Sequence, residues 1–184
     1  MKNNSPSMEL PVPVDDGAAS HLEGKQLPNV TLTATSGEKI NLQTLPGLVV
    51  YYFYPMTGRP GIPAPNDWSN IPGAKGCTPQ SCHFRDLYSE IKNLQAQVFG
   101  ISSQNTGYQL EAKERLELPF ELISDTILAL KNSLQFPTFE VEGIELYKRM
   151  TLIAQDGVIS KVFYPVFPPE KNPEDVLAWL QSNT

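Results

Sequence analysis

Hydrophobic and polar positions alternate along the first part of the chain with the two-residue period of β-strands. Residues 30–33 and 39–42 alternate on either side of a Ser-Gly pair, which predicts a β-hairpin. Residues 47–54 form a continuous apolar run, rich in β-branched and aromatic side chains, that ends at Pro55. A run of this kind is typical of a strand that is buried on both faces of a sheet.

A helical period follows the two cysteines. Its apolar residues recur at steps of three and four positions: Phe84, Leu87, Tyr88, Ile91 and Leu94. Thr78 is the expected N-cap, and Pro79 suits the first helical position. The pattern therefore predicts an amphipathic helix whose apolar face packs into a core.

Strand and helix patterns then alternate to the end of the chain. The expected elements are strands over residues 97–102, 120–123, 148–154 and 158–164, and helices over residues 105–116, 125–134 and 172–181. Asp156-Gly157 marks a tight hairpin, and Asn172 is the expected cap of the last helix. This order predicts an α/β fold with a mixed central sheet, helices on both faces and an N-terminal β-hairpin.

Composition divides the chain into an arm, a domain and an insertion. Residues 1–23 are polar and lack an apolar period, so we expect a flexible arm before a domain over residues 24–184. Residues 56–76 contain four prolines and four glycines in 21 positions, too many for a regular element. This insertion is either a tolerated surface loop or a lid or partner-docking loop around Trp68.

Charge and hydropathy restrict the partners. The net charge of the 184-residue chain is −6, with no block of like charges, which argues against nucleic acid or an anionic membrane surface as the partner. The longest apolar run, residues 48–54, is too short to span a bilayer. The first ten residues lack the pattern of a secretory signal. We therefore expect soluble partners and a cytoplasmic location.

The two cysteines have unequal positions. Cys77 lies immediately before, or in, the first turn of the predicted helix, where free amides and the helix dipole favour thiolate over thiol. Cys82 is five positions on, which in an intact helix means a Cα separation of roughly 8 to 9 Å. A disulfide needs less than about 7 Å. The two sulfurs can therefore bond only if the start of the helix unwinds.

Three other interpretations of the pair fit the sequence less well. A zinc site needs four ligands, and the only other soft candidates are His21, in the arm, and His83, next to Cys82. A thioredoxin-like disulfide exchanger has two residues between its cysteines, whereas this chain has four. If both were ordinary buried cysteines, their position at a capped helix start would be a coincidence.

The cysteine segment resembles a known family. Residues 76–86, Gly-Cys-Thr-Pro-Gln-Ser-Cys-His-Phe-Arg-Asp, are similar to the active-site pattern G-C-T-x-x-x-C-x-F-R-D of the peroxiredoxin Q, or bacterioferritin comigratory protein, class of peroxiredoxins. The other matching segments are residues 52–55, 99–102, 118–120 and 149–153. The resemblance covers roughly residues 24–182.

The resemblance implies a thioredoxin-like fold and a thiol-dependent peroxidase that reduces hydrogen peroxide and organic hydroperoxides. By position, Cys77 would be the peroxidatic cysteine, Cys82 the resolving cysteine and Arg149 the active-site arginine. The resulting disulfide would be recycled by a thioredoxin- or glutaredoxin-type reductant, without cofactor or metal, in a monomer or weak homodimer. The alternatives are a thioredoxin-fold redox sensor or binding module without peroxidase turnover, and a general disulfide reductase.

The chain departs from the family pattern just before Cys77. The family places a proline seven residues and a threonine three residues before the peroxidatic cysteine, where this chain has Asn70 and Ala74. Thr57 is the first candidate to supply the missing hydroxyl by folding back. The other two possibilities are that Thr78 does so or that no hydroxyl is used.

Overall fold

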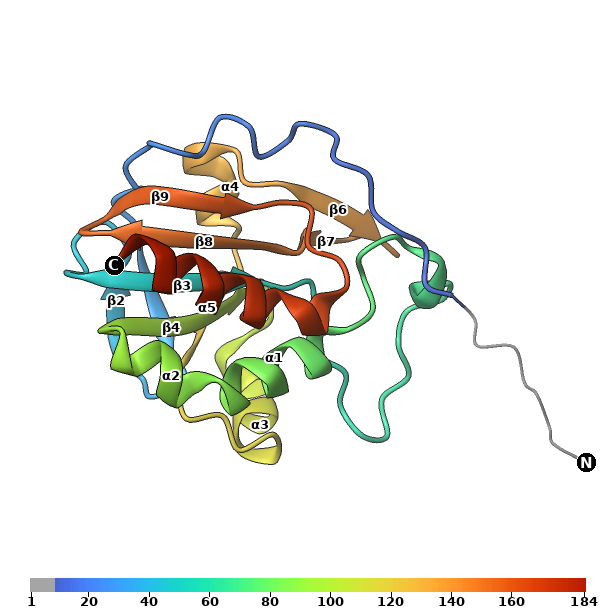
Figure 1. Ribbon diagram of the computed structural model, residues 1–184. Coiled ribbons are helices and arrows are strands. Elements are labelled where there is room, and N and C mark those ends of the chain that lie inside the picture. The colour runs from blue at the N-terminus through green and yellow to red at the C-terminus, as the bar shows by residue number, and fades with distance from the viewer. Residues whose placement is uncertain (1–8) are drawn as a thin grey trace, which may run out of the picture.

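A seven-stranded mixed sheet forms the centre of the protein, whose computed structural model describes residues 9–184. The strand order is β2-β1-β5-β4-β3-β8-β9 (Figure 1). The strands of this sheet are β1 (Thr31–Ala34), β2 (Lys39–Asn41), β3 (Leu48–Phe53), β4 (Ala96–Ser102), β5 (Leu122–Ser124), β8 (Met150–Gln155) and β9 (Val158–Phe163). β3 pairs in parallel with β4 and antiparallel with β8, so it is the strand that connects the two halves of the sheet.

Helices and a small hairpin cover the sheet. The helices are α1 (Cys77–Asp86), α2 (Tyr88–Asn93), α3 (Thr106–Arg115), α4 (Ala129–Leu134) and α5 (Asn172–Asn183), with short 3-10 turns η1 (Trp68–Asn70) and η2 (Pro169–Lys171). β6 (Thr138–Val141) and β7 (Ile144–Tyr147) form a separate two-stranded sheet. Figure 1 shows α1, α2 and α5 on one face and α4 with the β6–β7 hairpin on the other. None of the helices in the described part of the chain is long and apolar enough to cross a membrane.

β3 supplies aromatic side chains to both core layers, because alternate residues of a strand point to opposite faces. Tyr52 points toward α1 and stacks on Phe84, with ring centroids 4.6 Å apart. Phe53 points to the other face and meets Phe136 edge-on at 5.1 Å. Gly100 of β4 leaves the space for Tyr52, since a Cβ there would lie 2.6 Å from the tyrosine ring. β3 is therefore buried along its whole length, as the apolar run predicted.

Most elements predicted from the sequence are confirmed. Both hairpins form, and the second one turns at Asp156 and Gly157 with φ values of 49° and 81°. Residues 56–76 contain no α-helix or β-strand. The β6–β7 hairpin was not predicted, and the strand and helix expected from residues 120 and 125 begin at Leu122 and Ala129. Asp125 still caps that helix, because its carboxylate accepts the backbone amides of Ala129 and Leu130.

Two predicted helix caps are wrong. α1 begins at Cys77, preceded by Gly76 in the left-handed region, so Thr78 lies inside the helix. α5 begins at Asn172 itself, preceded by Lys171. The side chain of Asn172 turns into the protein, where Thr151 donates a hydrogen bond to it. The predicted start was two residues too late for α1 and one residue too late for α5, because each cap was inferred from side-chain type alone.

The arm expected over residues 1–23 is packed against the domain in its described part, from residue 9 onward. Ala19 and Leu22 are buried in the core, so the packed domain begins before the predicted boundary at residue 24. Asp16 binds Lys148 and Tyr164, each at 2.7 Å. The hydrogen bond from Lys148 and then that from Tyr164 hold the pKa of Asp16 far below its ordinary value. Residues 1–8, the rest of the predicted arm, lie outside the described residues.

Candidate active site

Cys77 is the first residue of α1 and is buried, with 4% of its surface exposed. Gly76 makes this placement possible. Its φ is 116°, and a Cβ at this position would lie 2.6 Å from the ring of Pro169 in η2. The backbone amides in the first turn of a helix have no intrahelical acceptor and carry the positive end of the dipole. The start of α1 therefore favours negative charge on the Cys77 sulfur.

Arg149 brings a cation to this sulfur. It immediately precedes β8 and is buried, and its Nη2 lies 3.2 Å from the Cys77 Sγ. The guanidinium also donates to the carbonyls of Gly73 and Ala74, at 3.3 and 3.0 Å, and to the Gln80 side-chain oxygen at 2.5 Å. None of these four partners is a carboxylate. The site therefore places a buried cation against the Cys77 sulfur, with no carboxylate among the partners of the guanidinium to neutralise it.

Cys82 lies on the same helix, half-buried beside the core layer that contains Cys77. α1 runs without interruption from Cys77 to Asp86, and both cysteines are free. Five residues of continuous helix separate the two Cα atoms by more than a disulfide allows. The prediction that the pair cannot bridge while α1 is wound agrees with this geometry.

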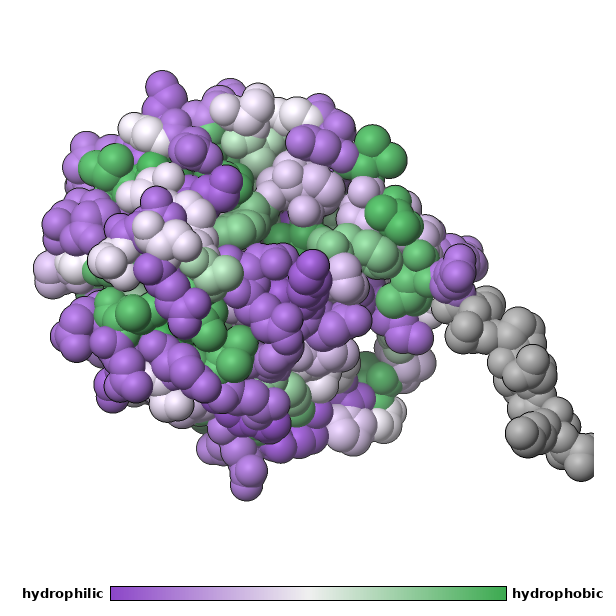
Figure 2. Space-filling model, in the orientation of Figure 1, coloured by the Kyte–Doolittle hydropathy of each residue, from purple (hydrophilic) through white to green (hydrophobic). Residues whose placement is uncertain are grey.

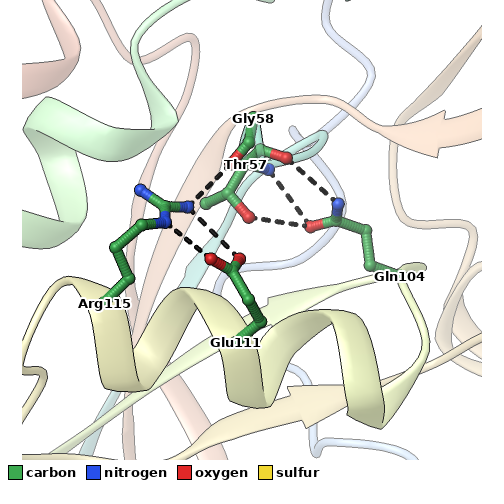
Figure 3. Close-up of polar contacts among 5 residues, drawn as sticks. All are labelled: Thr57, Gly58, Gln104, Glu111 and Arg115. Atoms are coloured by element: carbon green, nitrogen blue, oxygen red, sulfur yellow. Dashed lines mark hydrogen bonds and ion pairs between the residues drawn. The ribbon is translucent and has the colours of Figure 1, made fainter. Parts of the chain in front are cut away.

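Thr57 is held by Gln104 instead of approaching Cys77 (Figure 3). Its amide and hydroxyl donate to the Gln104 side-chain oxygen at 3.1 and 3.3 Å, and its carbonyl accepts from the same side chain. The next carbonyl, that of Gly58, accepts from Arg115, which is paired with Glu111. Among the described residues no hydrogen bond joins Thr57 to Cys77. The structure therefore brings Cys77 and Arg149 together and leaves Thr57 outside their hydrogen bonds.

The chain is similar to known proteins over most of its length. The redoxin family model matches residues 22–178. The chain belongs to the redoxin family. Peroxiredoxin Q, chloroplastic, from Oryza sativa subsp. japonica is 31% identical over 161 residues, which are 87% of this chain and 67% of the rice protein. The corresponding protein of Suaeda salsa is 30% identical, over 87% of this chain and 68% of its own length.

Solved structures show the same fold. Peroxidoxin BcpB from Mycobacterium tuberculosis superposes on this redoxin with a TM-score of 0.71 at 24% identity, over 89% of this chain and 99% of that one. Peroxiredoxin Q from Xanthomonas campestris gives a TM-score of 0.69 at 22% identity, over 89% and 97%. The predicted thioredoxin-like fold and peroxiredoxin Q class are confirmed. Membership of this class makes the protein a thiol-dependent peroxidase, as the cysteine segment predicted.

Tyrosines of this redoxin line the inner side of α1. Tyr52 OH lies 3.0 Å from the Ser81 hydroxyl, and the two share a hydrogen bond. Burial raises the pKa of Tyr52 well above its ordinary value, and neighbouring Tyr54, Cys77 and Cys82 raise it further. Tyr52 therefore stays neutral beside the cysteines and adds no charge that would oppose the thiolate.

A pocket of about 360 Å³ borders Arg149. Its walls come from the described N-terminal segment, the insertion and the β6–β7 hairpin, and include Val12, Val14, Ile71 and Phe139. Figure 2 shows apolar side chains gathered at the right-hand end of the molecule. The redoxin therefore presents an apolar cavity next to the arginine that contacts Cys77. Local sequence patterns do not predict this cavity, because its walls are far apart along the chain.

The histidines considered for a zinc site lie elsewhere. His21 hydrogen-bonds the Leu134 carbonyl, and His83 hydrogen-bonds the Glu170 carbonyl. Within residues 9–184, no group of three or more histidine, cysteine or acidic side chains is arranged to hold a metal ion. Gln80, by contrast, belongs to the site and was missed. Its position one helical turn after Cys77 was the signal that would have found it.

Proposed function

We propose that Cys77 is the peroxidatic cysteine, Cys82 the resolving cysteine and Arg149 the active-site arginine of this thiol-dependent peroxidase. The observation that carries the proposal is the 3.2 Å contact between the Arg149 guanidinium and the Cys77 sulfur. Both groups are buried at the start of a helix. A buried sulfur held by a cation and by helix amides has the electrostatics that a nucleophilic thiolate requires.

In the first step the Cys77 thiolate attacks one oxygen of the hydroperoxide. The S–O bond forms as the O–O bond breaks, so the sulfur is oxidised by two electrons and the peroxide is reduced by two. The departing oxygen leaves as hydroxide or alkoxide and takes a proton from water. Negative charge moves from sulfur toward that oxygen, and Arg149 is positioned to stabilise it while it moves.

In the second step the Cys82 thiol attacks the Cys77 sulfenic acid. The S–S bond forms and water leaves, which requires the first turns of α1 to unwind. A dithiol of the thioredoxin or glutaredoxin type then reduces the disulfide by exchange, which regenerates both thiols and oxidises the donor. The proposal includes this reductant, a cytoplasmic location, and a protein that is a monomer or a weak homodimer.

The pocket beside Arg149 supports organic hydroperoxides as substrates in addition to hydrogen peroxide. Its volume of about 360 Å³ exceeds what hydrogen peroxide fills, and its walls include Val12, Val14, Ile71 and Phe139. Apolar walls favour an alkyl or aryl group by roughly 0.8 kcal/mol for each methylene removed from water. The organic part of the substrate would occupy this pocket while its peroxide group reaches the Cys77 sulfur.

Val14→Asp is expected to raise the KM for cumene hydroperoxide about three- to tenfold and to leave hydrogen peroxide reduction unchanged. Val14 is 82% exposed, so a charge at this wall disfavours the aryl group without disturbing the core. Ile127→Asp is the matched control, because Ile127 is 76% exposed and does not line the pocket. Equal effects on the two peroxides, or of the two variants, would rule out this use of the pocket.

Stopped-flow oxidation of the wild type tests the proposed function directly. Hydrogen peroxide and cumene hydroperoxide are mixed with the reduced protein, and the peptide that contains both cysteines is then analysed by mass. The expected result is rapid oxidation, loss of two hydrogens from this peptide, and turnover when thioredoxin and its reductase are supplied. Oxidation no faster than that of a free thiol would instead favour the redox sensor or binding module, and turnover of insulin disulfides without peroxide would favour a disulfide reductase.

A further inference from the structure

A buried chain of hydrogen bonds connects Arg149 to the start of α5. Arg149 Nη1 donates to the side-chain oxygen of Gln80 at 2.5 Å, and Gln80 Nε2 donates to Asn172 Oδ1 at 3.1 Å. The hydroxyl of Thr151 donates to the same Asn172 oxygen at 2.7 Å. Gln80 and Thr151 are fully buried, and Asn172 is 3% exposed. Side chains of β8, α1 and α5 therefore meet in one polar cluster inside the apolar core.

The charge of Arg149 fixes the orientation of every amide in this cluster. A guanidinium only donates, so Gln80 must turn its oxygen toward Arg149 and its NH₂ group toward Asn172. Asn172 must then present its oxygen, and the Thr151 hydroxyl must donate to it. If Asn172 presented its NH₂ group instead, Gln80 would have to reverse and place a donor against the guanidinium. Only one orientation of the two amides is therefore compatible with these three hydrogen bonds, and in that orientation the Gln80 oxygen holds Arg149.

Asn172 is an unusual choice for its position. Asparagine disfavours helix interiors and is normally found at caps, yet here it is the first residue of α5 and its side chain is buried. The cap position is taken by Lys171, which makes no side-chain cap. The helix therefore gains nothing from an asparagine cap, and the side chain serves the contact with Gln80.

The contact also ties α5 to the part of α1 that must unwind. Gln80 lies between Cys77 and Cys82, in the first turns of α1. The other polar links from α1 to this region are partly exposed: His83 hydrogen-bonds the Glu170 carbonyl and lies 3.5 Å from the carboxylate of Glu174. Of these links, the one from Gln80 to Asn172 is buried, and a buried hydrogen bond is costly to break without replacement.

We propose that Asn172, supported by Thr151, is a positioning residue for both half-reactions. It holds Gln80, and through Gln80 it holds Arg149 against the Cys77 sulfur, which speeds oxidation by the peroxide. The same bond resists unwinding of α1, which slows formation of the Cys77–Cys82 disulfide. The inference rests on the proposed function, since it assigns opposite effects on the two steps of that cycle.

Asn172→Leu is expected to slow oxidation of Cys77 about tenfold and to speed disulfide formation about three- to tenfold. Leucine has nearly the same size but accepts no hydrogen bond, so Gln80 and Arg149 lose their fixed orientation. Stopped-flow mixing followed by acid quench, alkylation and mass analysis measures the two steps separately with hydrogen peroxide. A variant that was only less stable would not show opposite changes in the two rates.

Asn172→Asp is the rescue variant. A carboxylate in this place accepts the bonds of Gln80 and Thr151 as the amide does, and the start of α5 favours its negative charge. We expect it to keep at least about half of the wild-type oxidation rate. Val176→Ala is the matched control, because it removes buried apolar volume from the same helix without touching the cluster. It is expected to lower the melting temperature and leave both rates within about twofold.

Thr151→Val tests the cluster from its other end and serves if Asn172→Leu does not fold. It removes the hydroxyl that fixes Asn172, and the expected result is oxidation slowed about threefold, with faster disulfide formation. Unchanged rates in folded Asn172→Leu or Thr151→Val, a loss in Asn172→Asp equal to that in Asn172→Leu, or the same pair of changes in Val176→Ala would each overturn the inference. A wild type that forms no Cys77–Cys82 disulfide would overturn the proposed function instead.

Discussion

Cys77→Ser is expected to abolish peroxide reduction, so that turnover falls to the background of the assay. A serine hydroxyl remains protonated at neutral pH even next to Arg149, and it forms no product equivalent to a sulfenic acid. The substitution changes one atom in a buried position that accepts a small polar group. Peroxide consumption is measured with thioredoxin and thioredoxin reductase as the supply of electrons, and thermal unfolding shows that the variant is folded.

Cys82→Ser is the matched variant for this prediction. It retains the Cys77 thiolate, so one equivalent of peroxide is consumed at close to the wild-type rate and the sulfenic acid accumulates. Dimedone labelling followed by mass analysis locates that species on Cys77. Equal residual turnover in the two variants would contradict the assignment of unequal roles, and so would dimedone labelling of Cys82 in the Cys77→Ser variant.

Arg149→Met is expected to slow oxidation of Cys77 by about 10²- to 10³-fold, the loss typical of removing one preorganised donor from a charged transition state. Methionine matches the length of the arginine stem but brings no charge to the sulfur. It also leaves the carbonyls of Gly73 and Ala74 and the Gln80 oxygen without their donor. A lower melting temperature is therefore expected as well. Single-turnover oxidation by hydrogen peroxide measures the rate.

Arg149→Lys separates charge from geometry. An ammonium keeps the charge but cannot make four separate contacts in the planar arrangement of a guanidinium, so we expect an intermediate loss of about tenfold. Lys161→Gln removes a cation from the neighbouring strand β9, away from the sulfur, and is expected to leave the rate within about twofold. Oxidation of Arg149→Met at the wild-type rate would exclude a role for the guanidinium in the reaction.

Local sequence patterns were sufficient to predict most helices and strands, because these elements depend mainly on residues that are close together in the sequence. The period after Cys82 predicted one helix, which the structure divides at Leu87 into α1 and α2. The Asp156-Gly157 pair predicted the turn between β8 and β9. The same local reasoning misplaced the starts of α1 and α5. At both starts a residue distant in sequence decides the local structure. Pro169 leaves no room for a Cβ at position 76, and Gln80 hydrogen-bonds the side chain of Asn172. Cap preferences alone contain no information about such partners.

The N-terminal segment from residue 9 is a second place where local sequence patterns were insufficient. Leu22 lies in a polar segment without an apolar period, so the sequence predicted flexibility there. It is fully buried, because the sheet and its neighbouring strands leave an apolar surface that this segment covers. The β6–β7 hairpin was also missed, although it provides a wall of the pocket beside Arg149. Whether one segment packs over another depends on the position of both in the folded protein, which local sequence patterns do not contain.

By itself the sequence determined that Cys77 and Cys82 are unequal, because a helix start and its five-residue spacing are local properties. It also carried enough of the family pattern to predict the fold and the peroxidase class. Only the tertiary structure decided which groups surround the sulfur. Arg149 reaches Cys77 because β8 pairs with β3, and Asn172 reaches Gln80 because α5 packs on α1. These contacts join residues about 70 to 90 positions apart, and packing, not local propensity, sets such distances.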